Sequence, residues 1–229
     1  IKDVNVFELS TTYSKNTELQ NLAIACCGEY NGLAFKQISY KADYYLMKGF
    51  VETIFKNLGV EESRYKLVRV DQNDTNYHPG RSAYIMIGKE IVGVIGNIHP
   101  LMEKKYNVKD VYVVELNLTT LLNLKTSKVK FVDIPMYPSV SRDIALVMDK
   151  DVATYDVCRK IIQASKQLVK ETKIFDVYEG EHIGANKKSV AINLIFQDPK
   201  GTLEENTINA VMEKILESVS KEFDAVLRA

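Results

Sequence analysis

The sequence predicts an α+β protein in which a module of antiparallel sheet precedes a smaller two-layer domain. Residues 136–229 alternate short apolar runs with amphipathic stretches, in the order strand, helix, strand, strand, helix, strand. That βαββαβ order is typical of a split βαβ domain. Residues 1–128 hold several strand-like apolar runs and one substantial helical pattern. A chain of 229 residues is long enough for two such domains.

In the first module we expect strands at residues 4–9, 19–28, 84–87, 91–96 and 111–116. Residues 44–58 carry apolar side chains at helical spacing, and Gly59 follows as a candidate C-cap. Gly88 and Lys89 separate two of the strands and predict a hairpin.

In the second domain we expect strands at residues 144–148, 173–178, 189–196 and 225–228, and helices at 155–169 and 204–223. Gly180 and Gly184 mark the turn between the two middle strands. Strand alternation puts Asp176 and Tyr178 on one face of the sheet. Phe175 and Val177 are then expected on the other face, against the helices.

The segment before this domain predicts a linker. Residues 125–138 contain three lysines and two prolines and few helix signals, so we expect the linker at 129–135. The chain opens inside an expected strand and without Met, and we therefore interpret it as a fragment of a longer polypeptide.

Composition excludes several classes of protein. No apolar run approaches the ~20 residues of a membrane helix, so no membrane role is expected. Three cysteines, two of them adjacent, give neither a disulfide framework nor metal-ligand spacing, which favours a cytoplasmic location. Thirty basic and thirty acidic residues cancel. That balance argues against non-specific binding to nucleic acid, but it is compatible with contacts to a few exposed bases.

Catalytic and metal-binding patterns are missing from the sequence. The three histidines (His78, His99 and His182) are scattered, and two of them precede proline, which favours rigid corners over metal ligands. No nucleophile signature and no phosphate-binding glycine loop occurs. Arg81, after the Pro79-Gly80 pair, could grip a phosphate or carboxylate. We favour a structural role, with a type II turn that starts the next strand.

Several motifs in order carry a family resemblance. In the second domain they are Tyr137-Pro138-Ser139-Val140-Ser141-Arg142-Asp143-Ile144-Ala145, Phe175-Asp176-Val177-Tyr178-Glu179-Gly180, Lys187-Lys188-Ser189 and the final Leu227-Arg228. In the first they are Val6-Phe7-Glu8-Leu9, Asp43-Tyr44-Tyr45-Leu46-Met47-Lys48-Gly49, His78-Pro79-Gly80-Arg81-Ser82-Ala83 and Gly93-Val94-Ile95-Gly96-Asn97-Ile98-His99-Pro100. The whole chain thereby resembles the C-terminal portion of the beta subunits of bacterial phenylalanine–tRNA ligases.

This resemblance implies an inactive, synthetase-like module followed by a ferredoxin-fold anticodon-binding domain. It implies two partners, the phenylalanine tRNA and the alpha subunit, in an assembly of two alpha and two beta chains. It further implies that the whole enzyme uses ATP and magnesium, but no cofactor, metal or catalysis is expected from this fragment. In the second domain, the implied anticodon-binding residues are Ala145, Asp176, Tyr178 and Ser189.

Charged residues near these positions leave two interpretations open. Arg142 could contact phosphate, or it could pair with Asp143 or another acid. Lys187 and Lys188 are either phosphate contacts or solvated turn lysines.

Two other function classes share features of the second domain. Amino-acid-sensing ACT-type domains have the same strand and helix order, so fold alone does not separate them. They usually carry a glycine-rich turn after the first strand, whereas residues 148–151 here are charged and contain no glycine. An RNA-recognition motif would need aromatic residues on the third strand, and residues 189–193 contain none.

Overall fold

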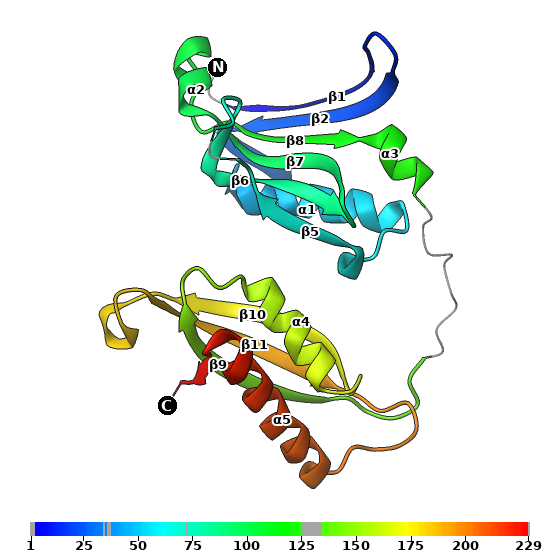
Figure 1. The fold of residues 1–229 in the computed structure, drawn as a ribbon, viewed down its shortest axis with the longest axis vertical. Coiled ribbons are helices and arrows are strands. Elements are labelled where there is room, and N and C mark those ends of the chain that lie inside the picture. Colours follow the sequence, from blue (N-terminus) through cyan, green and yellow to red (C-terminus); the bar gives the residue numbers. More distant parts are fainter. Residues whose placement is uncertain (1–2, 34, 36–37, 72, 125–133, 229) are drawn as a thin grey trace. The chain divides into compact units, whose positions relative to one another are not determined.

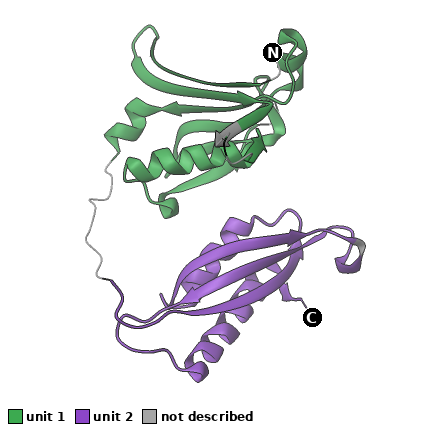
Figure 2. Ribbon diagram, turned by 180° about the vertical axis from the view of Figure 1, so that it is seen from behind, with its two compact units in different colours: residues 1–131 green, residues 132–229 purple. Residues whose placement is uncertain are grey.

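The computed structural model describes residues 3–33, 35, 38–71, 73–124 and 134–228. The chain divides into two compact units, residues 1–131 and 132–229 (Figure 2). Each unit has its own buried core. Most of the expected linker, residues 129–135, lies outside the described residues.

The first unit is built on a six-stranded sheet with the order β1-β2-β8-β7-β6-β5 (Figure 1). Every neighbouring pair in this sheet is antiparallel. The strands are β1 (Val4–Tyr13), β2 (Glu18–Cys27), β5 (Tyr65–Arg69), β6 (Tyr77–Ile87), β7 (Glu90–Ile98) and β8 (Tyr112–Asn117). Gly88 takes a positive φ of 63° in the tight turn between β6 and β7, so the hairpin expected at Gly88-Lys89 is present.

Helix α1 (Tyr44–Asn57) covers one face of this sheet (Figure 1). The Asp43 carboxylate accepts a hydrogen bond from the Leu46 amide at 2.7 Å and so caps its N-terminus. At the other end, Gly59 adopts a positive φ of 73°, and the Val60 amide donates to the Phe55 carbonyl at 2.8 Å. The buried stripe of α1 packs on the sheet through Met47, Val51, Phe55, Ile85, Ile95, Val114 and Leu116.

Smaller elements complete the first unit. They are a two-stranded hairpin of β3 (Glu29–Leu33) and β4 (Ile38–Lys41), the 3-10 turn η2 (Glu62–Arg64), and the short helices α2 (Pro100–Tyr106) and α3 (Leu118–Asn123). The apolar patterns in the sequence predict α1 and the other five strands of the large sheet, but not these smaller elements or β5.

The expected type II turn at Pro79-Gly80 is wrong. Both residues lie within β6, where the pairing with β7 jumps from Tyr77 to Ser82. A type II turn needs a positive φ at its third residue, and Gly80 is not among the glycines that have one. The extra residues in β6 are accommodated as a bulge instead.

The second unit has a four-stranded antiparallel sheet with the order β10-β11-β9-β12. Its elements are β9 (Val140–Asp149), α4 (Thr154–Ala164), β10 (Val169–Tyr178), the 3-10 turn η3 (Glu181–Ile183), β11 (Lys187–Phe196), α5 (Glu205–Phe223) and β12 (Val226–Leu227). This is the βαββαβ order that the sequence predicts, so the expected α+β fold class is confirmed.

Both helices of the second unit cover the same face of its sheet, and Figure 2 shows the face without helices. The covered face buries alternate residues of the two central strands, Ile144, Leu146, Met148, Val190, Ile192, Leu194 and Phe196, against residues of α4 and α5. The intervening residues lie on the opposite face, which we call the open face.

Two expectations for the second unit need correction. Helix α4 ends at Ala164 rather than at Val169, because Lys166 and Gln167 take positive φ values of 51° and 71° and turn the chain into β10. Phe175 and Val177 do not pack against the helices, since they are 59% and 53% exposed. A bulge between Ile174 and Asp176 inserts Phe175 as an unpaired residue. Val177 does pair with the buried Val190, but its own side chain is left uncovered.

Within the described ranges, every helix is too short or too polar to span a lipid bilayer.

Candidate nucleic-acid interface

The strand register brings five of the seven residues singled out by the sequence to the open face. Asp176 pairs with Ala191, which in turn pairs with Ala145. One row further along, Tyr178 pairs with Ser189, which pairs with Val147. Lys187 occupies the same face of β11 one position beyond Ser189 in the strand alternation. The expectation that Asp176 and Tyr178 share a face agrees with this register.

Arg228 joins this group from the opposite edge of the sheet. Its amide donates to the Ala145 carbonyl at 2.8 Å, so the backbone just after β12 is fixed beside β9. Its guanidinium carbon lies 5.2 Å from the centre of the Tyr178 ring, a cation–π contact. Because β9 and β11 separate the two residues, both side chains must reach over the sheet to meet.

Small side chains make this contact possible. Ala145, Ala191 and Ser189 occupy the central strands between Tyr178 and Arg228. Gly180 serves the same purpose at the end of β10, because a Cβ there would lie 2.2 Å from the Tyr178 hydroxyl oxygen. The ring can therefore fold down toward the turn after β10.

The two polar residues expected to read a base differ in accessibility. Asp176 is exposed at the edge strand, where its carboxylate can accept hydrogen bonds. Ser189 is only 3% exposed. A ligand can reach the Ser189 hydroxyl only after the side chains above it have moved.

Of the two lysines, only Lys187 lies on the open face. Its ammonium is 3.4 Å from the Asp149 carboxylate, a partly exposed ion pair. Lys188 projects to the helix side, since it pairs with the buried Met148. Its ammonium donates to the carbonyls of Lys150 at 3.0 Å and Val152 at 2.6 Å.

These two bonds close the loop between β9 and α4, and burial lowers the pKa of Lys188 against the raising effect of Glu179 and Asp151. The geometry favours the structural interpretation of Lys188. The same two bonds hold the loop after the first strand, where ACT-type domains usually carry a glycine-rich turn.

Arg142 likewise lies on the helix side of β9, because it pairs with Leu194. Its guanidinium is 3.7 Å from the carboxylate of Glu205 in the first turn of α5. The neighbouring Asp143 instead accepts a hydrogen bond from Asn193 at 2.5 Å. Of the alternatives left open for Arg142, the structure therefore favours pairing with an acid.

Arg228 has a contact that the sequence does not predict. The closing strand is recognisable from its apolar residues, and the final Leu-Arg is one of the family motifs, but neither assigns a partner to the side chain. Strand alternation could have predicted the face on which Arg228 lies, because a residue two positions beyond Val226 shares the face of Val226 and Val147.

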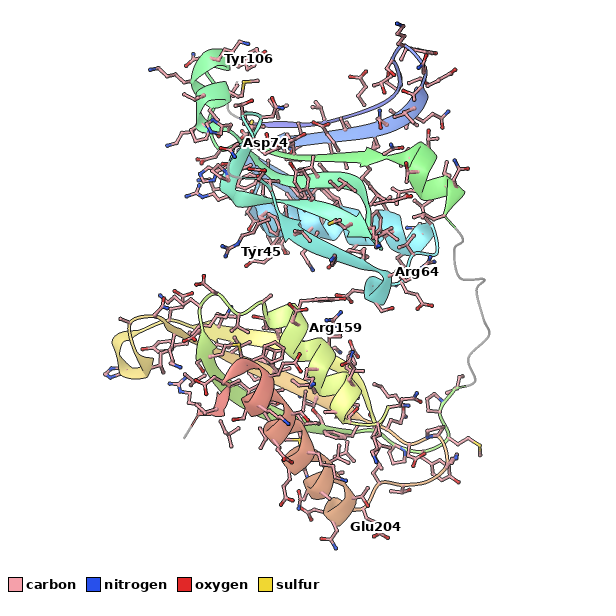
Figure 3. All side chains as sticks on the ribbon, viewed as in Figure 1. Tyr45, Arg64, Asp74, Tyr106, Arg159 and Glu204 are labelled. Carbon is pink, nitrogen blue, oxygen red and sulfur yellow. The ribbon has the colours of Figure 1, made fainter. Side chains whose placement is uncertain are left out.

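The first unit offers a different kind of surface. The sheet face away from α1 holds an open hollow of about 470 Å³ whose lining includes Glu8, Asn21, Tyr84 and Glu115. Two tyrosines near it bond to carboxylates: Tyr77 donates to Glu115 at 2.7 Å, and Tyr84 to Asp74 (labelled in Figure 3) at 3.2 Å. Burial, followed by these bonds, raises the pKa of both phenols.

Both histidines of the first unit accept hydrogen bonds from backbone amides. His78 accepts a hydrogen bond from the Gly80 amide at 3.0 Å, and His99 accepts one from the Leu101 amide at 3.1 Å. Both contacts use Nδ1 and favour the interpretation of His-Pro as a rigid corner. In the part of the chain that the structure describes, no three His, Cys, Asp or Glu side chains are grouped as a metal site would require.

Two family models match this chain. One is described as the phenylalanyl tRNA synthetase beta chain CLM domain and matches residues 1–118. The other is described as the ferredoxin-fold anticodon binding domain and matches residues 135–228.

Curated relatives match over nearly the whole chain. The phenylalanine–tRNA ligase beta subunit of Geobacillus kaustophilus is 36% identical over 235 residues, which cover 100% of this chain and 29% of that protein. The Bacillus subtilis beta subunit is 37% identical over 224 residues, covering 98% and 28%. This chain therefore spans less than a third of the length of these relatives.

Among solved structures, a pyrrolysyl tRNA synthetase from Desulfitobacterium hafniense covers 53% of this chain at 16% identity. Its TM-score of 0.39 is too low to establish a shared fold. The family assignment depends on the sequence matches, of which the first family model alone covers more than half of the 229 residues. The chain belongs to the phenylalanyl-tRNA synthetase beta chain family, and its second unit matches that family's ferredoxin-fold anticodon binding domain.

Proposed function

We propose that this chain binds the anticodon loop of the phenylalanine tRNA through the open face of its second unit. The observation that supports this most is the register, which gathers Ala145, Asp176, Tyr178 and Ser189 on one helix-free face. Bases of single-stranded loops are recognised by aromatic stacking and by hydrogen bonds to their edges. Tyr178 supplies a ring, Asp176 an exposed acceptor and Ser189 a hydroxyl.

The charge balance defines the kind of binding. The chain has 30 basic and 30 acidic residues, so it lacks the excess of positive charge that non-specific phosphate binding requires. In this proposal the chain contacts a few bases, while other parts of a larger assembly hold most of the tRNA backbone. Its binding is accordingly weak alone and depends only slightly on salt.

The first unit, in the same proposal, contacts the alpha subunit of the ligase. Its edge strand β1 carries the exposed apolar residues Val6, Phe7 and Leu9, which are 54%, 75% and 63% exposed. A long apolar edge strand of this kind is normally covered by a partner. The assembly of two alpha and two beta chains would join phenylalanine to its tRNA with ATP and magnesium, bound elsewhere than in these residues.

A cytoplasmic location belongs to the proposal as well. Cys26, Cys27 and Cys158 all lie in the described segments and form no disulfide. Unbridged thiols are typical of a reducing compartment. Burial, followed by the neighbouring Cys27, raises the pKa of the Cys26 thiol and keeps it unreactive.

The proposal is tested by NMR titration of the isotope-labelled chain with the anticodon stem–loop of the phenylalanine tRNA, and with a stem–loop of scrambled anticodon. We expect amide shifts on β9, β10 and β11 with the cognate loop, and weaker ones with the scrambled loop. Shifts confined to α4 and α5, or equal responses to the two RNAs, would overturn the proposal.

A further inference from the structure

A second hollow lies at the β12 edge of the second unit's sheet. It measures about 390 Å³ and is open to solvent, and its walls come from three separate elements. Val147 on β9 and Val226 and Leu227 on β12 give it an apolar lining, while His182 on η3 and Arg228 add polar groups. None of these residues is among the proposed anticodon contacts, although Arg228 touches one of them, Tyr178.

Arg228 connects the hollow to the Tyr178 ring, because it lines the hollow and also contacts the ring. Tyr178 pairs with Ser189, Ser189 pairs with Val147, and Val147 pairs with Val226, so ring and hollow lie along the same row of the sheet. Arg228 stands between them, with its guanidinium on the ring and its side chain lining the hollow. Successive bases of a single strand bind to sheet surfaces as neighbours of this kind, each on its own apolar or aromatic support.

We propose that this hollow holds the nucleotide next to the one stacked on Tyr178, and that Arg228 contacts the phosphate joining the two. The proposal builds on the proposed anticodon binding and extends it by a second subsite. Arg228 suits the role because a guanidinium has several donors in one plane and matches a phosphate. Its backbone is held by the hydrogen bond to Ala145, while its side chain remains exposed.

The free chain shows why Arg228 has to move. Its guanidinium already contacts one face of the Tyr178 ring at 5.2 Å, so no base fits between the two. A base that stacks on this face displaces the guanidinium. The hollow, which Arg228 already lines, gives the guanidinium room, and there the linking phosphate would carry the opposite charge.

His182 supplies the second stacking surface. It lies in the turn after Gly180, it is exposed, and it is one of the residues that line the hollow. Histidine rings stack on RNA bases as other aromatic side chains do. Substituting an exposed turn residue leaves the core of the unit intact, so a binding change can be attributed to the lost ring.

The test combines protein variants with altered RNAs. The chain and its variants His182→Ala, Tyr178→Ala and Arg228→Gln are titrated with anticodon stem–loops in which one loop base at a time is replaced by an abasic site, and Kd is followed by NMR. The matched control is Arg159→Gln, which removes the same charge from α4 on the helix side (Arg159 is labelled in Figure 3). The Arg159 guanidinium forms an exposed ion pair with Asp156 at 3.5 Å.

We expect His182→Ala to weaken binding of the intact loop by about 5–10-fold, the lower part of the range for one base–aromatic stack. For one of the abasic loops, His182→Ala should bind as tightly as the parent chain, because the base that stacks on His182 is missing. For the loop that is abasic at an adjacent position, Tyr178→Ala should bind as tightly as the parent chain. Arg228→Gln should lower the slope of log K against log salt by about 0.7, the value for one phosphate on a single strand. Arg159→Gln should leave the slope unchanged.

Some outcomes overturn the second subsite alone. One is a titration with the cognate loop in which the NMR signals of Tyr178 and Ser189 shift but those of His182 and Val226 do not. Equal affinity of His182→Ala and the parent chain for every RNA is another, as is an unchanged salt slope in Arg228→Gln. If instead the parent chain does not distinguish the cognate loop from the scrambled one, the anticodon proposal itself fails.

Discussion

Replacing Tyr178 by alanine removes the proposed stacking surface, and the structure allows the effect to be estimated. A base–aromatic stack is worth about 1–3 kcal/mol. The incoming base must give up the contact between the ring and Arg228, a cation–π pair at 5.2 Å that at an exposed site is worth about 0.5–1 kcal/mol. The net loss of binding energy is then about 0–2.5 kcal/mol, centred near 1 kcal/mol, which corresponds to a rise in Kd of roughly fivefold and at most roughly 70-fold.

The assay measures binding of the phenylalanine tRNA, and of the same tRNA with a substituted anticodon, to the proposed assembly of alpha and beta chains at fixed salt. Fixed salt is required because the affinity of phosphate contacts changes with salt concentration. The matched control is Tyr178→Phe, which keeps the ring and loses only the hydroxyl that lies close to Gly180. We expect the phenylalanine variant to bind within about twofold of the parent, since the stack depends on the ring.

The discrimination between the two tRNAs decides the matter. If Tyr178→Ala retains the full discrimination while its fold remains intact by circular dichroism, Tyr178 is a structural residue and the assignment of the open face is wrong. If both variants lose it equally, the hydroxyl rather than the ring makes the contact.

Four further outcomes are expected. Lys188→Met should lower the free energy of unfolding in urea by about 1–3 kcal/mol, because two loop carbonyls lose a charged donor. Discrimination between tRNAs with different anticodons should stay unchanged. Unchanged stability together with weaker tRNA binding would instead make Lys188 a phosphate contact. The pKa of Tyr77 is raised above its ordinary value of 10.0, so the unfolded chain loses the phenol proton at a lower pH than the folded chain does. Above about pH 10 the free energy of unfolding should therefore fall, and it should fall less steeply in Tyr77→Phe than in the parent. Parallel curves of stability against pH in this range would contradict the expectation. Trypsin should cut first within residues 125–135, which are lysine-rich and lie near the division between the two units, and initial cleavage inside either unit would refute the expectation. The chain alone should give no phenylalanine-dependent pyrophosphate exchange, and exchange above a mock preparation would show a catalytic site in these residues.

Hydrophobic periodicity is sufficient to predict most of the fold. The buried stripe of α1 and the alternation in β9 and β11 are regular over many residues, so the period alone identifies them. The prediction for helix α4 runs too far because Leu168 and Val169 continue the apolar spacing, although they belong to the turn and the next strand. Lys166 and Gln167 are not residue types that favour a positive φ, so the sequence does not predict the turn that they form.

The candidate site is predictable only in part. Strand parity correctly places Asp176 and Tyr178 on one face and Val177 on the other. It does not predict the bulge at Phe175, nor that the helices leave the side chain of Val177 exposed. Arg228 is brought to Tyr178 by a pairing between β9 and β12, more than 75 residues apart in the chain. Contacts of this kind come from tertiary pairing, which local patterns do not encode.

The two central strands carry small side chains on the open face, and this small size matters for the surface. Ala145 and Ala191 end at Cβ, so they leave the space over β9 and β11 through which Arg228 reaches Tyr178. A valine at either position would keep every charge, ring and hydroxyl, yet would obstruct that passage. The volume that these alanines leave vacant is therefore itself a requirement of the surface, and an inventory of polar groups would overlook it.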